Sequence, residues 1–170
     1  RERLGRDFPM VNDHPDVAGV LRDGELLAVL GPALAAPFAD AGVTVVCAPE
    51  ARGPILGALA ATALGVGLVL ARKDERNHPG ADRRTESTPT WRGAPEVFLT
   101  RSFDFGPGDR VLVVDDWVTS GSSIAAVAAA VEAEGAVYVG ASVLVDKADP
   151  ATLARLRAIA LVRFDDLMSR

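Results

Sequence analysis

Two adjacent acids at the end of an apolar run are the residues of this sequence best placed to do chemistry. In VLVVDDWVTSGSSI, residues 111–124, Asp115 and Asp116 close the run, and a loop of small, mostly hydroxylated residues follows. The loop leads into an Ala-rich helical segment, so its hydroxyls and backbone N–H groups would gather at the positive end of a helix dipole. This arrangement is suited to binding a phosphate group.

The two carboxylates must contact a different part of the ligand, because they would repel a phosphate. The vicinal hydroxyls of a sugar are natural partners, since carboxylate oxygens accept hydrogen bonds from O–H donors. Together, the acids and the loop favour a ribose 5-phosphate. The alternative for the same residues is a helix N-cap with two serines and two solvent-facing aspartates.

The stretch resembles the 13-residue phosphoribosyl-pyrophosphate (PRPP) signature of type I phosphoribosyltransferases. In that family an apolar strand, two acids and two variable residues precede a small loop that usually ends close to Thr-Gly-Gly-Thr; here Ser122 replaces one glycine. The resemblance implies that Asp115 and Asp116 hold the ribose and ease the positive charge that develops on it. It also implies that the phosphate is bound by Thr119, Ser120, Gly121, Ser122 and Ser123.

A second stretch, APEARGPILGALAATALGVGLVLARK at residues 48–73, is similar to the adenine branch of the family. The likeness implies that Ala51, Arg52 and Gly53 form a pyrophosphate loop, in which the family often has a cis non-proline peptide, and that Lys73 adds a second cation. A fixed Arg and a Lys would stabilise the departing pyrophosphate electrostatically. We therefore expect Arg52 to be catalytic together with the two acids. The alternative for Arg52 is a surface salt bridge.

The likeness weakens in the segment between these two motifs. Trp91-Arg92-Gly93 stands where adenine enzymes have Glu-Tyr-Gly, and neither Glu86 nor Glu96 is in register with that acid. Thr119 replaces the Asp of enzymes that act on 6-oxopurines, which argues against hypoxanthine and guanine. Orotate enzymes carry a catalytic Lys in their mobile loop, and residues 80–101 contain no lysine. Adenine is therefore the first choice of base.

Recognition of the base leaves little trace in the sequence. Residues 1–24 are expected to form a hood over the site, in which Phe8 either stacks on the base or packs in the core. Backbone groups near Ala71 and Arg72 could meet the amine and N7 of adenine.

PRPP chemistry also implies a Mg²⁺ ion, held mainly by ligand oxygens and water. A dedicated protein cage for the metal is then not expected, and His14 and His78 are too isolated to be ligands. Family members are commonly homodimers. The alternative function is a non-catalytic module that senses PRPP or a nucleotide, while the lack of G-x-G-x-x-G argues against a dinucleotide oxidoreductase.

The elements that position these residues read as an α/β fold, a mostly parallel doubly wound sheet flanked by helices. Nearly continuous apolar runs predict strands at 43–48, 66–71, 110–115 and 137–145. Helices are predicted at 54–64 and 122–134, the second closed by Gly135.

The remaining segments are less regular. Residues 25–41 read as helical, with Pro32 and Pro37 implying a kink or two shorter helices. A short helix opening at Asp149-Pro150 and a last strand are expected near the end of the chain. Residues 74–95 carry many charges and little apolar periodicity, and are interpreted as a mobile lid or a disordered insertion.

Composition limits the class of protein. A chain of 170 residues with 49% hydrophobic residues suits a single domain over 1–170, and a net charge of −5 offers no basic field for nucleic acid. The one cysteine, Cys47, lies in an apolar run and reads as a buried strand residue in a reducing compartment. The charged start, RERLGRDF, is not followed by a signal-peptide core, and no apolar stretch is long enough to span a membrane. We expect a cytoplasmic protein.

Overall fold

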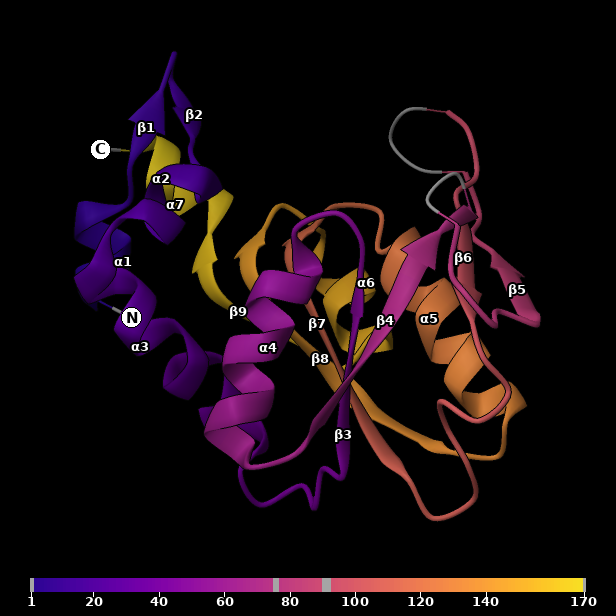
Figure 1. Cartoon of the computed structure of the whole chain (residues 1–170). Helices are drawn as coiled ribbons and strands as arrows, with labels where there is room; N and C mark the ends of the chain where they lie inside the picture. The colour runs from indigo at the N-terminus through magenta and orange to yellow at the C-terminus, as the bar shows by residue number, and fades with distance from the viewer. Residues whose placement is uncertain (1, 75–76, 90–92, 170) are drawn as a thin grey trace.

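A seven-stranded sheet forms the centre of the computed structural model, which describes residues 2–74, 77–89 and 93–169 (Figure 1). The strand order is β5-β6-β4-β3-β7-β8-β9. Neighbours from β4 to β9 run parallel, and β6 and β5 are added antiparallel at one edge. The mostly parallel sheet expected from the sequence is confirmed.

The strands of this sheet are β3 (Val45–Pro49), β4 (Gly67–Lys73), β5 (Arg83–Glu86), β6 (Val97–Thr100), β7 (Arg110–Val118), β8 (Val137–Asp146) and β9 (Ala158–Arg163). The helices that follow the N-terminal segment are α3 (Gly24–Ala35), the 3₁₀ helix η1 (Ala36–Phe38), α4 (Gly53–Leu64), α5 (Ser122–Ala133), α6 (Pro150–Arg155) and α7 (Phe164–Met168). No helix in the described ranges is both long and apolar enough to cross a bilayer.

The two faces of the sheet carry separate cores because successive side chains of a strand point in opposite directions. On one face, Val46 and Leu112 pack with α3 and α4. On the other face, Cys47 and Val113 pack with α5. Figure 1 shows α4 and α5 on opposite sides of the central strands. Strands covered on both faces explain the continuous apolar runs of the sequence.

The N-terminal segment lies at the β9 end of the molecule, where it meets the C-terminal helix (Figure 1). It contains α1 (Glu2–Asp7), a small antiparallel pair of β1 (Met10–Val11) and β2 (His14–Pro15), and α2 (Val17–Arg22). Helix α7 contacts both β2 and β9. The N-terminal segment and the C-terminal helix therefore pack against each other, a contact that the sequence did not indicate.

Two expected irregularities have clear structural outcomes. The predicted division into two shorter helices is found next to Pro37, where α3 gives way to η1, whereas α3 continues through Pro32. Residues 74–95 include β5, which the sequence did not predict. Arg83, Arg84 and Glu86 are exposed on this edge strand, so no apolar alternation marks it.

Close packing of α3 on α4 depends on Gly31. A Cβ atom at this position would lie 2.5 Å from the backbone oxygen of Leu59. We predict that Gly31→Ala lowers the free energy of unfolding by about 1–3 kcal/mol, because the two helices must separate to admit the methyl group. Gly24→Ala in the same helix is the matched control, since nothing lies within 4 Å of its Cβ position. Urea denaturation measures both, and equal stabilities would contradict the packing argument.

Candidate active site

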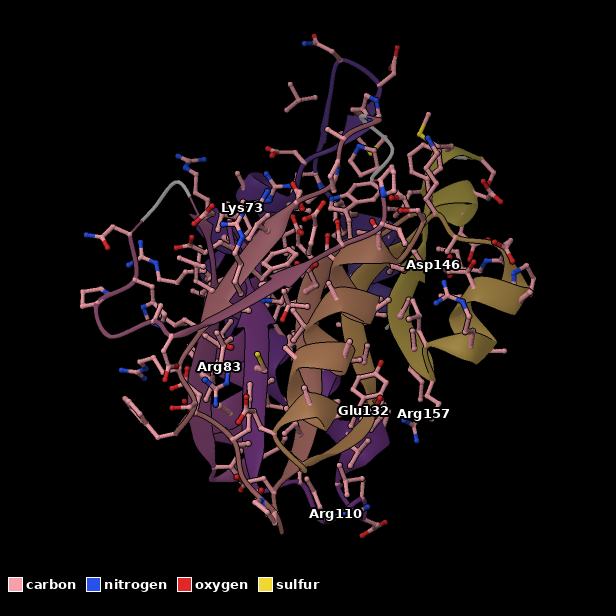
Figure 2. The ribbon with its side chains drawn as sticks, turned by 90° about the vertical axis from the view of Figure 1, so that its right-hand side faces the viewer. Lys73, Arg83, Arg110, Glu132, Asp146 and Arg157 are labelled. Atoms are coloured by element: carbon pink, nitrogen blue, oxygen red, sulfur yellow. The ribbon has the colours of Figure 1, made fainter. Side chains whose placement is uncertain are left out.

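A cavity of about 260 Å³ opens where β3, β4 and β7 end. In Figure 2 the carboxyl ends of the parallel strands lie in the upper half, where Lys73 and Asp146, the last residues of β4 and β8, are labelled. Arg110, the first residue of β7, is labelled at the bottom, at the opposite end of the sheet. The lining residues are Glu50, Ala51, Arg52, Lys73, Glu96, Asp115, Asp116, Trp117, Val118, Thr119, Ser120, Gly121, Ser122, Ser123 and Ile124. Every residue expected to bind PRPP lines the cavity, with the exception of Gly53.

The acidic pair lies inside β7 and not beyond it, because the strand continues to Val118 where the sequence predicted an end at residue 115. Asp115 and Asp116 are each only 9% exposed. The backbone N–H of Asp116 donates to Oδ1 of Asp115 at 2.8 Å. Burial, and then the neighbouring charge of Asp116, raise the pKa of Asp115 well above its ordinary value. The site therefore resists two full negative charges.

Arg52 partly offsets the charge of this pair. Its Nε donates to Oδ2 of Asp116 at 2.5 Å, and the Arg52 side chain remains half exposed at the mouth of the cavity. Arg52 precedes α4, in a loop that has a cis peptide between Glu50 and Ala51, as the resemblance implied. The salt bridge considered as the alternative for Arg52 is thus present, but its partner is one of the candidate catalytic acids.

Gly53 allows the loop of Arg52 to approach the acids. A Cβ atom there would lie 3.1 Å from Oδ1 of Asp115 and 3.2 Å from the backbone oxygen of Val114. Gly53 therefore belongs to the support of the site although it does not line the cavity.

The loop from Thr119 to Ser123 ends at the first residues of α5. Gly121 is the N-cap residue with φ 71°, and no side chain caps the helix. The left-handed backbone conformation favours glycine here, and a Cβ atom on Gly121 would lie 2.3 Å from Cδ1 of Leu156, whose side chain would have to shift. The hydroxyls of Ser120 and Ser122 lie 3.0 Å apart. An uncapped helix N-terminus with hydroxyls around it is suited to an anion.

Glu96, to which the sequence assigned no role, contributes to the same cavity. Its Oε1 lies 2.5 Å from Nζ of Lys73, and its Oε2 accepts from the hydroxyl of Ser123 at 3.2 Å. Glu96 immediately precedes β6, which pairs with β4 next to Lys73. Glu96 could have been assigned to the site only by predicting that β6 pairs with β4. Nothing local in the sequence indicates that pairing.

The residues proposed for base recognition, Phe8, Ala71 and Arg72, are not among those that line this cavity, although Ala71 and Arg72 contact Glu50, which does. Phe8 is 3% exposed within the core beside α2 and α3, which favours the packing role that was its alternative. The backbone oxygen of Ala71 accepts from the N–H of Glu50 at 3.0 Å, and Nε of Arg72 donates to the Glu50 carboxylate at 3.0 Å. Glu50 thus contacts the backbone of Ala71 and the side chain of Arg72, and recognition of the base by backbone groups near these residues stays a prediction. Trp91 and Arg92 lie outside the described residues.

Trp117 is an aromatic residue of the cavity that the sequence reasoning missed. The centroid of its ring lies 5.9 Å from the ring centroid of Phe164, the first residue of α7. The ring centroid of His14 lies 6.3 Å from that of Phe164. The C-terminal helix thus places Phe164 against Trp117, a contact that no local pattern could have indicated.

Metal binding by protein side chains alone has no support within the described ranges, where no group of three or more His, Cys, Asp or Glu residues could hold an ion. The donor set does fit a hard cation that arrives with its ligand, because Asp115 and Asp116 offer carboxylate oxygens beside an anion-binding loop.

The raised pKa of Asp115 makes stability depend on pH. The folded protein holds this proton more tightly than the unfolded chain, so ionised Asp115 costs stability above the folded-state pKa, and that cost disappears as the pH falls through it. We predict that Asp115→Asn raises the free energy of unfolding at pH 7 to 8 by on the order of 1 kcal/mol. The gain over the wild type should shrink at lower pH. Denaturant titrations across this range test it, with the exposed Asp40→Asn as control. A gain that does not change with pH would refute the assignment.

Comparison with known proteins agrees with this geometry. The profile of the phosphoribosyl transferase domain matches residues 31–161. The chain is 36% identical to an adenine phosphoribosyltransferase of Symbiobacterium thermophilum over 93% of this chain and 94% of the relative. It is 33% identical to an orotate phosphoribosyltransferase of Pelotomaculum thermopropionicum over 89% of this chain and 70% of the relative.

A solved structure agrees as well. The crystal structure of adenine phosphoribosyltransferase from Thermoanaerobacter pseudethanolicus superposes with a TM-score of 0.84 at 25% identity, covering 96% of this chain and 99% of that one. The resemblance inferred from the two motifs is confirmed, and the chain belongs to the type I phosphoribosyltransferase family.

Proposed function

We propose that this protein transfers the 5-phosphoribosyl group of PRPP to a purine, with adenine as the preferred base, and releases pyrophosphate. The observation that carries the proposal is the meeting in one cavity of an acid pair, the two cations Arg52 and Lys73, and an uncapped helix N-terminus. Each is complementary to one part of PRPP. The adenine phosphoribosyltransferases among the relatives support the choice of base.

The parts of the substrate are assigned by charge. The 5-phosphate would accept hydrogen bonds from the loop 119–123, and the ribose hydroxyls would donate to Asp115 and Asp116. Arg52 and Lys73 would bind the pyrophosphate. A ring nitrogen of the base then bonds to C1 of the ribose as the bond from C1 to the pyrophosphate oxygen breaks. The electron pair of that bond leaves with pyrophosphate, and the base nitrogen loses its proton to solvent.

Binding would exchange the partners of Arg52. Its present contact, Oδ2 of Asp116, is an acid that the ribose hydroxyls can engage in its place. As the pyrophosphate takes Arg52, Asp116 becomes free to accept from the sugar. The carboxylates then lie beside the positive charge that spreads over the ring in the transition state, and they stabilise it electrostatically.

A Mg²⁺ ion bound through pyrophosphate and ribose oxygens would fit beside Asp115 and Asp116, directly or through water, and would neutralise charge on the leaving group. Residues 1–24 and 74–95 remain the proposed hood and lid. The family resemblance also implies a homodimer and a cytoplasmic location, and sedimentation equilibrium tests the dimer.

The proposed reaction is tested with purified protein, PRPP, Mg²⁺ and a panel of adenine, hypoxanthine, guanine and orotate. We predict pyrophosphate release with adenine and at most weak release with the others, measured by a coupled phosphate assay. The nucleoside monophosphate product is identified by mass spectrometry. Saturable PRPP binding with no release for any base would contradict the enzymatic function.

The proposed role of Arg52 predicts that its removal weakens the binding of ligands that carry pyrophosphate and leaves the binding of AMP nearly unchanged. Arg52→Ala should weaken binding of pyrophosphate and PRPP by roughly 10- to 100-fold, because charge-assisted hydrogen bonds are lost. Binding of AMP, which lacks the pyrophosphate, should change little. Isothermal titration calorimetry measures both, with the exposed Arg155→Ala as control. Equal losses of affinity for AMP and for PRPP would contradict the assignment of Arg52 to the pyrophosphate subsite.

A further inference from the structure

The carboxylate of Glu96 already occupies two of the groups that the substrate needs. It contacts Nζ of Lys73 at 2.5 Å and accepts from the hydroxyl of Ser123 at 3.2 Å. Lys73 ends β4 on the pyrophosphate side of the cavity, and Ser123 belongs to the loop that faces the phosphate. One side-chain anion therefore bridges the two regions that are complementary to the anionic ends of PRPP.

The backbone holds Glu96 firmly in this place. Its N–H donates to Oγ of Ser87 at 2.9 Å, and the N–H of Ser87 donates to the backbone oxygen of Glu96 at 2.8 Å. Ser87 is itself buried, with 6% exposure. These bonds join the ends of β5 and β6, so the Glu96 side chain enters the cavity from a paired backbone.

Glu96 also separates two cavities. Together with Lys73 it lines both the 260 Å³ cavity of the acid pair and an adjoining one of about 420 Å³ next to Asp74 and Val97. Both members of the ion pair are about one quarter exposed, so solvent screens the attraction only in part. The ion pair thus lies where the two cavities meet.

The ion pair of Glu96 differs from that of Arg52 in what happens on binding. When Arg52 leaves Asp116, the ribose hydroxyls supply a new partner for that acid. PRPP offers Glu96 no such partner, because the groups that approach Lys73 and Ser123 are phosphate oxygens, which repel a carboxylate. Displacing Glu96 is therefore a cost that opposes substrate binding.

We propose that Glu96 is a built-in competitor of the substrate, which occupies Lys73 and Ser123 and must be displaced before the anionic groups of PRPP bind there. The inference rests on the proposed function in taking PRPP as the ligand. It concerns binding alone, so its test does not depend on turnover. It predicts that removing the charge of Glu96 increases affinity, whereas removal of a residue that helps to hold the substrate decreases it.

The test is calorimetric titration of Glu96→Gln with pyrophosphate and with PRPP, both in the presence of Mg²⁺. We expect about three- to tenfold tighter binding than in the wild type, because a partly screened ion pair no longer opposes the ligand. Glu86→Gln, a change of the same kind at an exposed position of β5, should leave affinity unchanged. Thermal unfolding checks that both variants fold, and Glu96→Ala provides a second neutral variant.

A double-mutant cycle assigns the effect to Lys73. In a Lys73→Met background, Glu96→Gln should increase pyrophosphate affinity much less than it does in the wild type. Affinity unchanged or reduced by both neutral variants of Glu96 would overturn the competitor role while leaving the proposed function intact. Failure of the wild type to bind either ligand would overturn both.

Discussion

The site depends on the burial of two adjacent carboxylates inside the central strand β7, near its carboxyl end. Such a pair is unfavourable by itself, as the raised pKa of Asp115 shows, and it persists because Arg52 lies against Asp116 and the backbone N–H of Asp116 lies against Asp115. Gly53 admits the arginine loop to this distance. The loop geometry, the start of α4 and the position of the acids are therefore parts of one electrostatic arrangement.

Both Arg52 and Lys73, the cations assigned to the pyrophosphate, are already paired with acids of the same cavity. Arg52 is paired with Asp116, and Lys73 with Glu96. A polyanionic ligand then binds by exchanging partners, and the gain from each new contact is reduced by the contact that it replaces. With the proposed assignment of the substrate, the two exchanges differ, since the ribose would compensate Asp116 and nothing in PRPP would compensate Glu96. Affinity for the substrate would then be set by acids as well as by cations.

Much of the fold and the central part of the site could be predicted from the sequence, because both are encoded locally. Continuous apolar runs mark the strands that are covered on both faces, and the residues of two contiguous motifs come together because parallel strands end at one edge. Glu96 and Phe164 could not be found in this way. Glu96 reaches the cavity through the pairing of β6 with β4, and Phe164 reaches Trp117 through the docking of the C-terminal helix. The edge strand β5 was missed because its exposed side chains show no alternation.

The most direct test of this account is a crystal structure of the protein with PRPP and Mg²⁺ bound in the absence of a base. The account predicts that the guanidinium of Arg52 has left Asp116 for the pyrophosphate, that the ribose hydroxyls lie against Asp115 and Asp116, and that the 5-phosphate lies on the loop 119–123. A complex in which Arg52 still contacts Asp116 while the pyrophosphate lies elsewhere would contradict it.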